Sequence, residues 1–309
     1  MTRYVLRRCF SMLGTVVLVS VINFLVIFLL PINPIDAIAG DKATPAVMAA
    51  IEKYYGLDRP IYEQYARYVW HGLHGDFGIS YQTSQPVAVE IAQRFPATAE
   101  LAAGAFVLTL VLGLGAGLLA SLHPGGVADG ALTVSTLLFN SLPAFWLGTV
   151  LLYVFGFRFP LLPLGGYGHG LHLQYLVLPA TTLALTEQAL YARLLRTQVF
   201  EVWHEDYVRT AWAKGLSRRA VHVRHVVRNA LLPVVTFAGV NLANLLSGLI
   251  LIETVFGWPG IGLLTYQSLT SFDVPVIMGT ALLSAILVTL ANFAVDLVYM
   301  TLDPRVAYH

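Results

Sequence analysis

Six long apolar segments divide this chain and limit the folds that it can adopt. A helix needs about 20 mostly apolar residues to cross a hydrocarbon core about 30 Å thick. Stretches of that length are residues 10–30, 97–122, 132–156, 173–197, 230–252 and 276–301. Only 11% of the residues are charged, whereas soluble globular domains carry about 25% charged residues. The sequence therefore predicts an all-α membrane protein with six transmembrane helices.

The positions of Lys and Arg orient these helices, because the cytoplasmic loops of membrane proteins are enriched in basic residues. If the N-terminus (residues 1–9) is cytoplasmic, six of the 18 Lys and Arg residues lie outside and the other twelve lie inside. An even number of spans then also places the C-terminal tail, residues 302–309, inside. The first segment is not expected to be a signal peptide, because its apolar run exceeds the usual length of about 7–15 residues.

A basic stretch between the fourth and fifth segments, residues 205–233, holds much of this charge. A short helix is expected over residues 206–214, and its apolar face comprises Tyr207, Val208, Ala211 and Trp212. Gly215 can adopt the positive φ that ends a helix, and Ser217 can cap the basic helix that follows. An ordered basic loop between membrane spans indicates a docking site for a soluble partner.

Several runs of this sequence resemble the permeases of ATP-driven importers. AWAKGLS (211–217), followed by RNALLPVVT (228–236), is similar to the cytoplasmic loop of the permease family that carries peptides, nickel and related solutes. The run from 56 to 81 and ETVFGWPGIG (253–262) resemble the same family. Importers in general have Glu-Ala where Arg209 and Thr210 stand here, and this departure is usual in the peptide and nickel branch.

The resemblance implies a type I ABC importer permease architecture with a small external helical cap after the first span. Residues 31–96 would form this external region. Within it, capping residues and apolar spacing predict helices at about 45–55 and 58–72. Residues 97–301 would form the core permease domain, in which residues 198–229 are the cytoplasmic coupling loop. A coupling helix in this loop would insert into a cleft of the ATPase subunit, as the resemblance implies. The residues expected to make that contact are Asp206, Tyr207, Arg209, Ala211, Trp212, Lys214 and Gly215.

The resemblance also implies partners, location and solute. A second, non-identical permease chain, two ATP-binding subunits and an external solute-binding protein are expected, in the inner membrane of a bacterial cell. The ATPase subunits would bind ATP and Mg²⁺, whereas this chain would bind no cofactor and no metal. Di- or oligopeptides are the expected solute. Nickel, a nickel or metallophore chelate, and glutathione remain alternatives.

Polar residues inside the apolar segments are candidates for the solute pathway. A carboxylate at the depth of Glu187 is costly in a membrane, so it either contacts a cationic group of the solute or has an internal partner. Asn140 and Ser141 precede a helix-breaking proline. Asn241 and Asn244 lie three residues apart and either line the pathway or hold helices together.

A second candidate site follows the fifth segment. Glu253 precedes a tight turn formed by Trp258, Pro259 and Gly260, in which the tryptophan is an aromatic anchor. The amphipathic segment after the turn, residues 263–269, is too short to cross a membrane. An external gate or re-entrant element is therefore expected here.

The sequence lacks the motifs of several other functional classes. It has no G-x-x-x-x-G-K-[ST] phosphate loop, no H-E-x-x-H and no G-x-S-x-G. Its single cysteine, Cys9, rules out an internal disulfide or a Cys-based metal cluster, and a net charge of +1 argues against nucleic-acid binding. A permease without enzymatic activity is expected. A secondary transporter or a channel is the alternative from another class, but neither an internal repeat nor a filter motif is visible.

Overall fold

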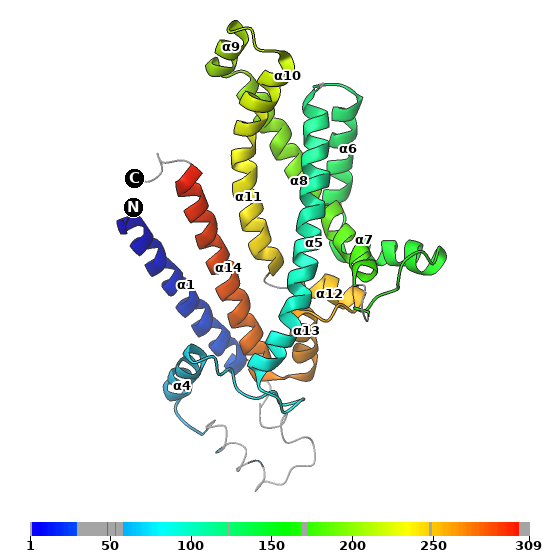
Figure 1. The fold of residues 1–309 in the computed structure, drawn as a ribbon. Coiled ribbons are helices and arrows are strands. Elements are labelled where there is room, and N and C mark those ends of the chain that lie inside the picture. Colours follow the sequence, from blue (N-terminus) through cyan, green and yellow to red (C-terminus); the bar gives the residue numbers. More distant parts are fainter. Residues whose placement is uncertain are drawn as a thin grey trace. The chain divides into compact units, whose positions relative to one another are not determined.

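The computed structural model describes residues 2–29, 48, 53, 58–122, 124–168, 172–246 and 249–302. Helices dominate these residues, and the only extended pairing among them is one antiparallel bridge between Ile79 and Pro86 (Figure 1). The chain divides into two compact units. Unit 1 comprises Met1–Ala99, Leu246–Thr254 and Pro259–Phe293, and unit 2 comprises Glu100–Leu245, Val255–Trp258 and Ala294–His309.

Unit 1 is built from helices at both ends of the sequence. Its elements are α1 (Thr2–Leu29), α4 (Ile61–Leu73), the start of α5 (Val87–Leu122), most of α12 (Ile250–Phe256), α13 (Ile261–Ser271) and most of α14 (Val274–Leu302). The hydroxyls of Tyr65 on α4 and Ser20 on α1 are 2.9 Å apart, and the Tyr65 ring meets that of Phe24 with centroids 5.3 Å apart. Thus α4 confirms the second helix predicted after the first span. The helix predicted at 45–55 lies almost entirely outside the described residues.

Unit 2 contains the remaining helices. They are the rest of α5, α6 (Val127–Ser141), α7 (Ala144–Leu151), η1 (Leu152–Arg158), α8 (Leu173–Trp203), α9 (Asp206–Ala213), α10 (Arg218–Val221), η2 (His222–Val227) and α11 (Arg228–Leu246). Two glycines let α5 approach α8 closely. A Cβ on Gly113 would lie 2.7 Å from the Cβ of Tyr191, and one on Gly117 would lie 2.7 Å from the carbonyl oxygen of Ala192. The G-x-x-x-G spacing of these two residues therefore marks a close helix contact.

Within the described residues, three helices are long and apolar enough to cross a membrane: Val87–Leu122, Arg218–Leu246 and Val274–Ala294. A fourth span is possible if the pair Asp129–Ser141 and Ala144–Arg158, bent by 100°, is counted as one. The bend occurs at Pro143, where the sequence predicted a break. Helix α8 covers the predicted fourth segment but carries charged residues, among them Glu187 and Arg193.

Two predicted segments differ from the helices that form. Helix α5 begins at Val87, ten residues before the expected start at residue 97, because Pro96 is accommodated inside the helix. The boundary expected between the external region and the core therefore falls within one continuous helix. The predicted fifth segment, 230–252, spans a break: α11 ends at Leu246 and α12 begins at Ile250. Hydropathy does not reveal this break because the residues after it are also apolar.

Candidate coupling surface and external turn

The basic stretch forms a helical hairpin, residues 204–227, which we call the coupling hairpin. As predicted, α9 ends before Gly215, whose φ is +78°. Ser217 caps α10, since its hydroxyl accepts a hydrogen bond from the Ala220 amide at 3.4 Å. A Cβ on Gly215 would meet no atom within 4 Å. The glycine is therefore required by its backbone conformation and not by lack of space.

The apolar face predicted for α9 is divided between two environments. Val208 and Ala211 are buried, with 1% and 4% exposure, whereas Tyr207 and Trp212 are 43% and 40% exposed. The Trp212 ring packs edge-on against Trp203, with centroids 6.3 Å apart. Of the expected contact residues, Ala211 thus packs inside the hairpin. The two aromatic side chains remain accessible to a partner.

The polar residues expected to contact the ATPase lie on the surface of the hairpin. Asp206, Arg209 and Lys214 are all exposed. Arg209 forms an ion pair with Asp206 at 3.4 Å, but their side chains are 72% and 96% exposed. Such exposed pairs contribute little to stability. These charges are therefore free to be rearranged when a partner binds.

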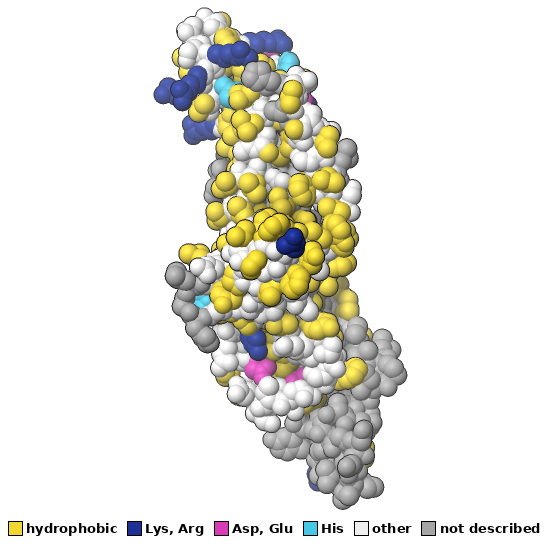
Figure 2. All heavy atoms as spheres, turned by 90° about the vertical axis from the view of Figure 1, so that its right-hand side faces the viewer, with side chains coloured by type: hydrophobic (Ala, Val, Ile, Leu, Met, Phe, Trp, Pro, Cys, Tyr) yellow, Lys and Arg dark blue, Asp and Glu magenta, His cyan; other side chains and the backbone are white. Residues whose placement is uncertain are grey.

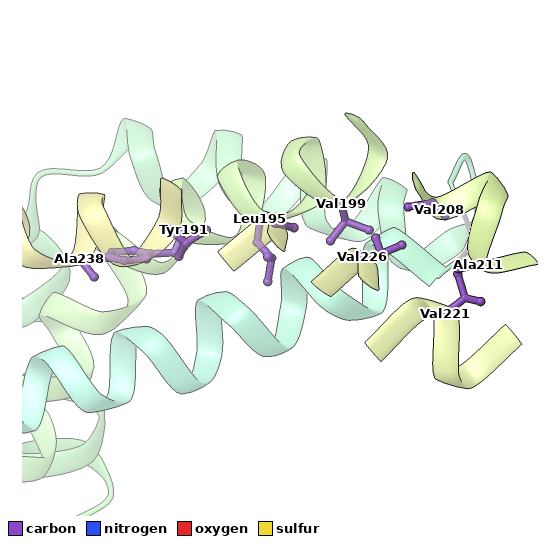
Figure 3. Packing of buried hydrophobic residues seen from close by; sticks show 10 residues of the cluster. Tyr191, Leu195, Val199, Val208, Ala211, Val221, Val226 and Ala238 are labelled. Atoms are coloured by element: carbon purple, nitrogen blue, oxygen red, sulfur yellow. The ribbon is translucent and has the colours of Figure 1, made fainter. Parts of the chain in front are cut away.

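The buried side of the hairpin is continuous with the packing between α8 and α11. Figure 3 shows this row of side chains running from Ala238 and Tyr191 through Leu195, Val199 and Val226 to Val208, Ala211 and Val221. All of these residues belong to one cluster of buried side chains. The buried face of α9 therefore packs in one continuous cluster with the two long helices.

Glu187 has an internal partner. The Asn241 side-chain amide on α11 donates a hydrogen bond to the Glu187 carboxylate on α8 at 2.9 Å, and both side chains are half-buried. The structure thus joins two of the five predicted pathway residues. The others are not part of this pair: Asn140 and Ser141 are exposed at the α6–α7 bend, and Asn244 is exposed on α11.

The predicted external turn contains a closed polar network in unit 1, which we call the Glu253 network. The Glu253 carboxylate is fully buried. It accepts hydrogen bonds from the Thr98 hydroxyl at 2.8 Å and the Leu263 amide at 2.9 Å. The Thr98 hydroxyl in turn accepts one from the Ile261 amide at 2.8 Å. Burial raises the pKa of Glu253 above its ordinary value, and the donated hydrogen bonds oppose this shift.

This network explains why position 260 in the turn is a glycine. A Cβ on Gly260 would overlap with both carboxylate oxygens of Glu253 and with the Thr98 hydroxyl. The Glu253 carboxylate and Thr98 together bind the otherwise unsatisfied amides at the start of α13. Glu253 and Gly260 therefore hold the short helix in place, and Pro259 lies half-buried beside them.

Trp258 is the aromatic anchor that the sequence predicts, and it lies fully buried in unit 2. Its ring meets Tyr167 edge-on, with centroids 4.8 Å apart. The Tyr167 hydroxyl donates a hydrogen bond to Glu100 at 2.6 Å, which raises the pKa of Tyr167 to about 12. Sequence reasoning missed Tyr167, Glu100 and Thr98, because nothing in their local pattern marks their distant partners.

A polar pocket of about 260 Å³ in unit 1 was also not predicted. Asp273 fixes one wall by accepting hydrogen bonds from the Ser80 hydroxyl at 2.5 Å and the Tyr81 amide at 3.1 Å. Glu90, which accepts a hydrogen bond from Thr83, and Arg94 also line this pocket. Among the described residues, no group of three or more His, Cys, Asp or Glu side chains could hold a metal ion.

Comparison with known proteins gives consistent matches. Residues 101–308 match the family described as binding-protein-dependent transport system inner membrane component, and residues 1–102 match the N-terminal region of such membrane components.

Three relatives from Escherichia coli match nearly the whole chain. The probable D,D-dipeptide transport system permease protein DdpB is 36% identical, over 97% of this chain and 96% of its own. The glutathione transport system permease protein GsiC is 37% identical over all of both chains. The dipeptide transport system permease protein DppB is 33% identical, over 100% of this chain and 99% of its own.

One solved structure shares the fold. An inward-facing conformation of the MetNI methionine ABC transporter superposes with a TM-score of 0.50 at 19% sequence identity. The match covers 69% of this chain and 96% of the other. It supports the predicted type I importer architecture.

Proposed function

This chain belongs to the family of binding-protein-dependent transport system inner membrane components, and from that membership we propose that it forms half of the translocation pathway of a bacterial importer for di- or oligopeptides. The chain is a membrane-embedded permease subunit and not an enzyme. A permease of this kind works with ATP-binding subunits, which hydrolyse ATP, and with a solute-binding protein.

The names of the relatives support peptides as the solute. DdpB and DppB are named for dipeptides, and GsiC is named for glutathione, which is itself a small peptide. Glutathione is therefore the second candidate. No observation on this chain favours nickel or a chelate over these two.

We also propose the finer composition of the assembly. A second, non-identical permease would complete the pathway, and two subunits carrying ATP and Mg²⁺ would sit on the cytoplasmic side. The bacterial inner membrane would hold the complex, with both termini of this chain in the cytoplasm. The surplus of basic residues in the coupling hairpin supports this orientation, and Figure 2 shows Lys and Arg side chains gathered over the α9–α10 end of unit 2.

The structure of the coupling hairpin supports a mechanical link between the ATPase and the membrane helices. The exposed rings of Tyr207 and Trp212 would meet the ATPase, while Val208 and Ala211 join the buried row between α8 and α11. When ATP closes the ATPase subunits, α9 would move with them and α8 and α11 would follow. The spans would thereby alternate between openings to the two sides of the membrane.

The orientation is tested by labelling, because the chain has only one natural cysteine. In a Cys9→Ser background, Lys214→Cys reports on the hairpin and Arg59→Cys reports on the predicted external region; both native side chains are exposed. In sealed spheroplasts, a membrane-impermeant maleimide should label position 59 only. Position 214 should react after permeabilisation. Labelling of position 214 in sealed spheroplasts would contradict the proposed coupling.

The solute is tested by uptake. Cells without their own peptide importers would express this chain together with its partner subunits and receive labelled dipeptide, glutathione or Ni²⁺. We expect ATP-dependent accumulation of dipeptide, with glutathione as a weaker substrate. Accumulation of Ni²⁺ alone would contradict the peptide assignment while leaving the permease role intact.

A further inference from the structure

A groove of about 630 Å³ lies in unit 2 beside the end of α8, from Arg196 to Trp203. Its walls come from α8, the end of α5 with the turn after it, and the start of the α10–η2 helix. The lining residues are Ser121, Leu122, Pro124, Arg196, Val199, Phe200, Trp203, His204, Arg218, Arg219 and His222. Helix α9 contributes none of them. The groove therefore lies next to the exposed aromatic surface of α9 that we assign to the ATPase, and Trp203, which packs against Trp212, borders both.

The groove has a surplus of positive charge. Three guanidinium groups and two imidazoles line it, and no carboxylate does. Arg196 is held by Asp129, with Nη2 and Oδ2 2.7 Å apart, so its charge is neutralised. Arg218 and Arg219 are exposed and form no ion pair among the described residues. These two arginines are available to an anion from outside the chain.

Large apolar surfaces lie in the same groove as these charges. Phe200 is 56% exposed and Leu122 is 45% exposed, while the half-buried Trp203 forms part of the wall. Leu122 is the last residue of the apolar helix α5, so the groove lies where a membrane span ends. A free phosphate would use the arginines but would leave these apolar side chains uncovered.

We propose that the groove binds one anionic phospholipid. The phosphate would lie between Arg218 and Arg219, and the start of an acyl chain would cover Phe200 and Leu122, with the remainder in the bilayer. Basic pockets between helices at the cytoplasmic surface bind anionic head groups in this way. The site would tie α5 and α8 to α10, which is part of the coupling hairpin. It does not depend on which solute is carried.

Native mass spectrometry of the purified full-length chain tests the proposal. The chain is exposed to equal amounts of phosphatidylglycerol and phosphatidylcholine with identical acyl chains, and retained lipid is counted. Phosphatidylglycerol should be retained preferentially. In the double variant Arg218→Gln/Arg219→Gln its affinity should fall by about 30-fold, because each basic residue contributes about 1 kcal/mol toward an anionic lipid.

A matched variant distinguishes lipid binding in the groove from a general effect of the positive charge of the chain. Arg224→Gln/Arg228→Gln removes two exposed arginines just beyond the groove, and it should retain phosphatidylglycerol as the natural chain does. Equal retention of both lipids, or equal losses in the two double variants, would overturn the proposal. Circular dichroism of each variant establishes that it is folded.

Two further measurements identify the part of the lipid that is bound. Phosphatidylglycerol brominated on its acyl chain should quench Trp203, so the quenching should drop in Trp203→Phe. Displacement of the lipid by an equal concentration of inorganic phosphate would reduce the groove to a simple anion site and overturn the proposal. Loss of the lipid when the ATPase subunit binds would assign the groove to that protein interface instead.

Discussion

The Glu253 network and the coupling hairpin both carry sequence runs that mark the family, yet they are built in opposite ways. In the network a fully buried carboxylate, a hydroxyl and two backbone amides satisfy one another within unit 1. In the hairpin the polar residues of α9 are exposed, and its ion pair lies almost entirely in solvent. One region uses its characteristic residues to fix the backbone, and the other keeps them available for a partner.

This difference teaches where a substitution should act. A change in the network leaves buried polar groups without partners, which costs free energy of folding. A change on the exposed side of the hairpin leaves the fold intact and alters an interaction with another protein. Substitutions in the network should therefore lower stability, whereas those on the exposed side of the hairpin should lower transport.

Gly260→Ala should have the largest effect on folding. Its Cβ would overlap with the Glu253 carboxylate and the Thr98 hydroxyl. Both are held by backbone amides, so neither can move away without breaking hydrogen bonds. The free energy of unfolding should fall by about 3 kcal/mol or more, from overpacking combined with lost buried hydrogen bonds. Thermal unfolding in detergent and the amount of protein in the membrane measure this loss.

Gly115→Ala is the matched control, because an added Cβ at that helical glycine meets no atom within 4 Å. It should unfold at the temperature of the natural chain or slightly above it. If Gly260→Ala is as stable as this control, the close packing around Glu253 does not hold the turn.

Gly215→Val should act on coupling more than on folding. The residue needs φ of +78°, which a β-branched side chain strongly disfavours, although space is available around it. We expect a stability loss of about 1–3 kcal/mol. Solute uptake should fall to background while ATP hydrolysis continues in the assembled importer, because α9 would no longer be held at its angle to α10.

Gly215→Asn sharpens the same test. Asparagine tolerates the left-handed conformation better than other non-glycine residues, and a Cβ at this position meets no atom within 4 Å. Uptake in this variant should be largely restored relative to Gly215→Val. Equal loss in both variants would mean that the backbone conformation is not what the hairpin requires.

Glu187→Gln should have the smallest effect, because the substitution keeps the size of this half-buried side chain and its hydrogen-bond acceptor. A glutamine oxygen can still accept the hydrogen bond from Asn241, so stability should change by less than about 1 kcal/mol. Uptake of neutral and cationic dipeptides should then remain similar to that of the natural chain. A selective loss of cationic dipeptide uptake would instead show that the carboxylate contacts the solute.

Local patterns predicted much of this architecture. Glycine at position 215 and serine at 217 identified the end of one helix and the start of the next, because both act through their own backbone or the adjacent turn. Pro143 predicted the bend between α6 and α7 for the same reason. The spacing of Gly113 and Gly117 permits a close helix contact, but it does not identify α8 as the neighbour.

Interactions between distant residues could not be predicted. Thr98 and Glu253 lie 155 positions apart, and Glu187 and Asn241 lie 54 apart. No spacing rule connects such pairs, so the sequence alone could not identify the residue that hydrogen-bonds to each carboxylate. For a similar reason, the sequence could not predict which residues on the apolar face of α9 are buried and which are exposed. Helical periodicity placed Tyr207, Val208, Ala211 and Trp212 together, but only the neighbouring helices determine which of them are covered.

The buried row that joins α9 to α8 and α11 has a consequence for protein engineering. Because the buried side chains of the hairpin share one cluster with those of α8 and α11, the hairpin cannot be exchanged as an independent segment. A chimaera that receives residues 204–227 from another permease should also need the donor's matching residues at Leu195, Val199 and Ala230. Without them, the transplanted segment would face a surface shaped for a different sequence.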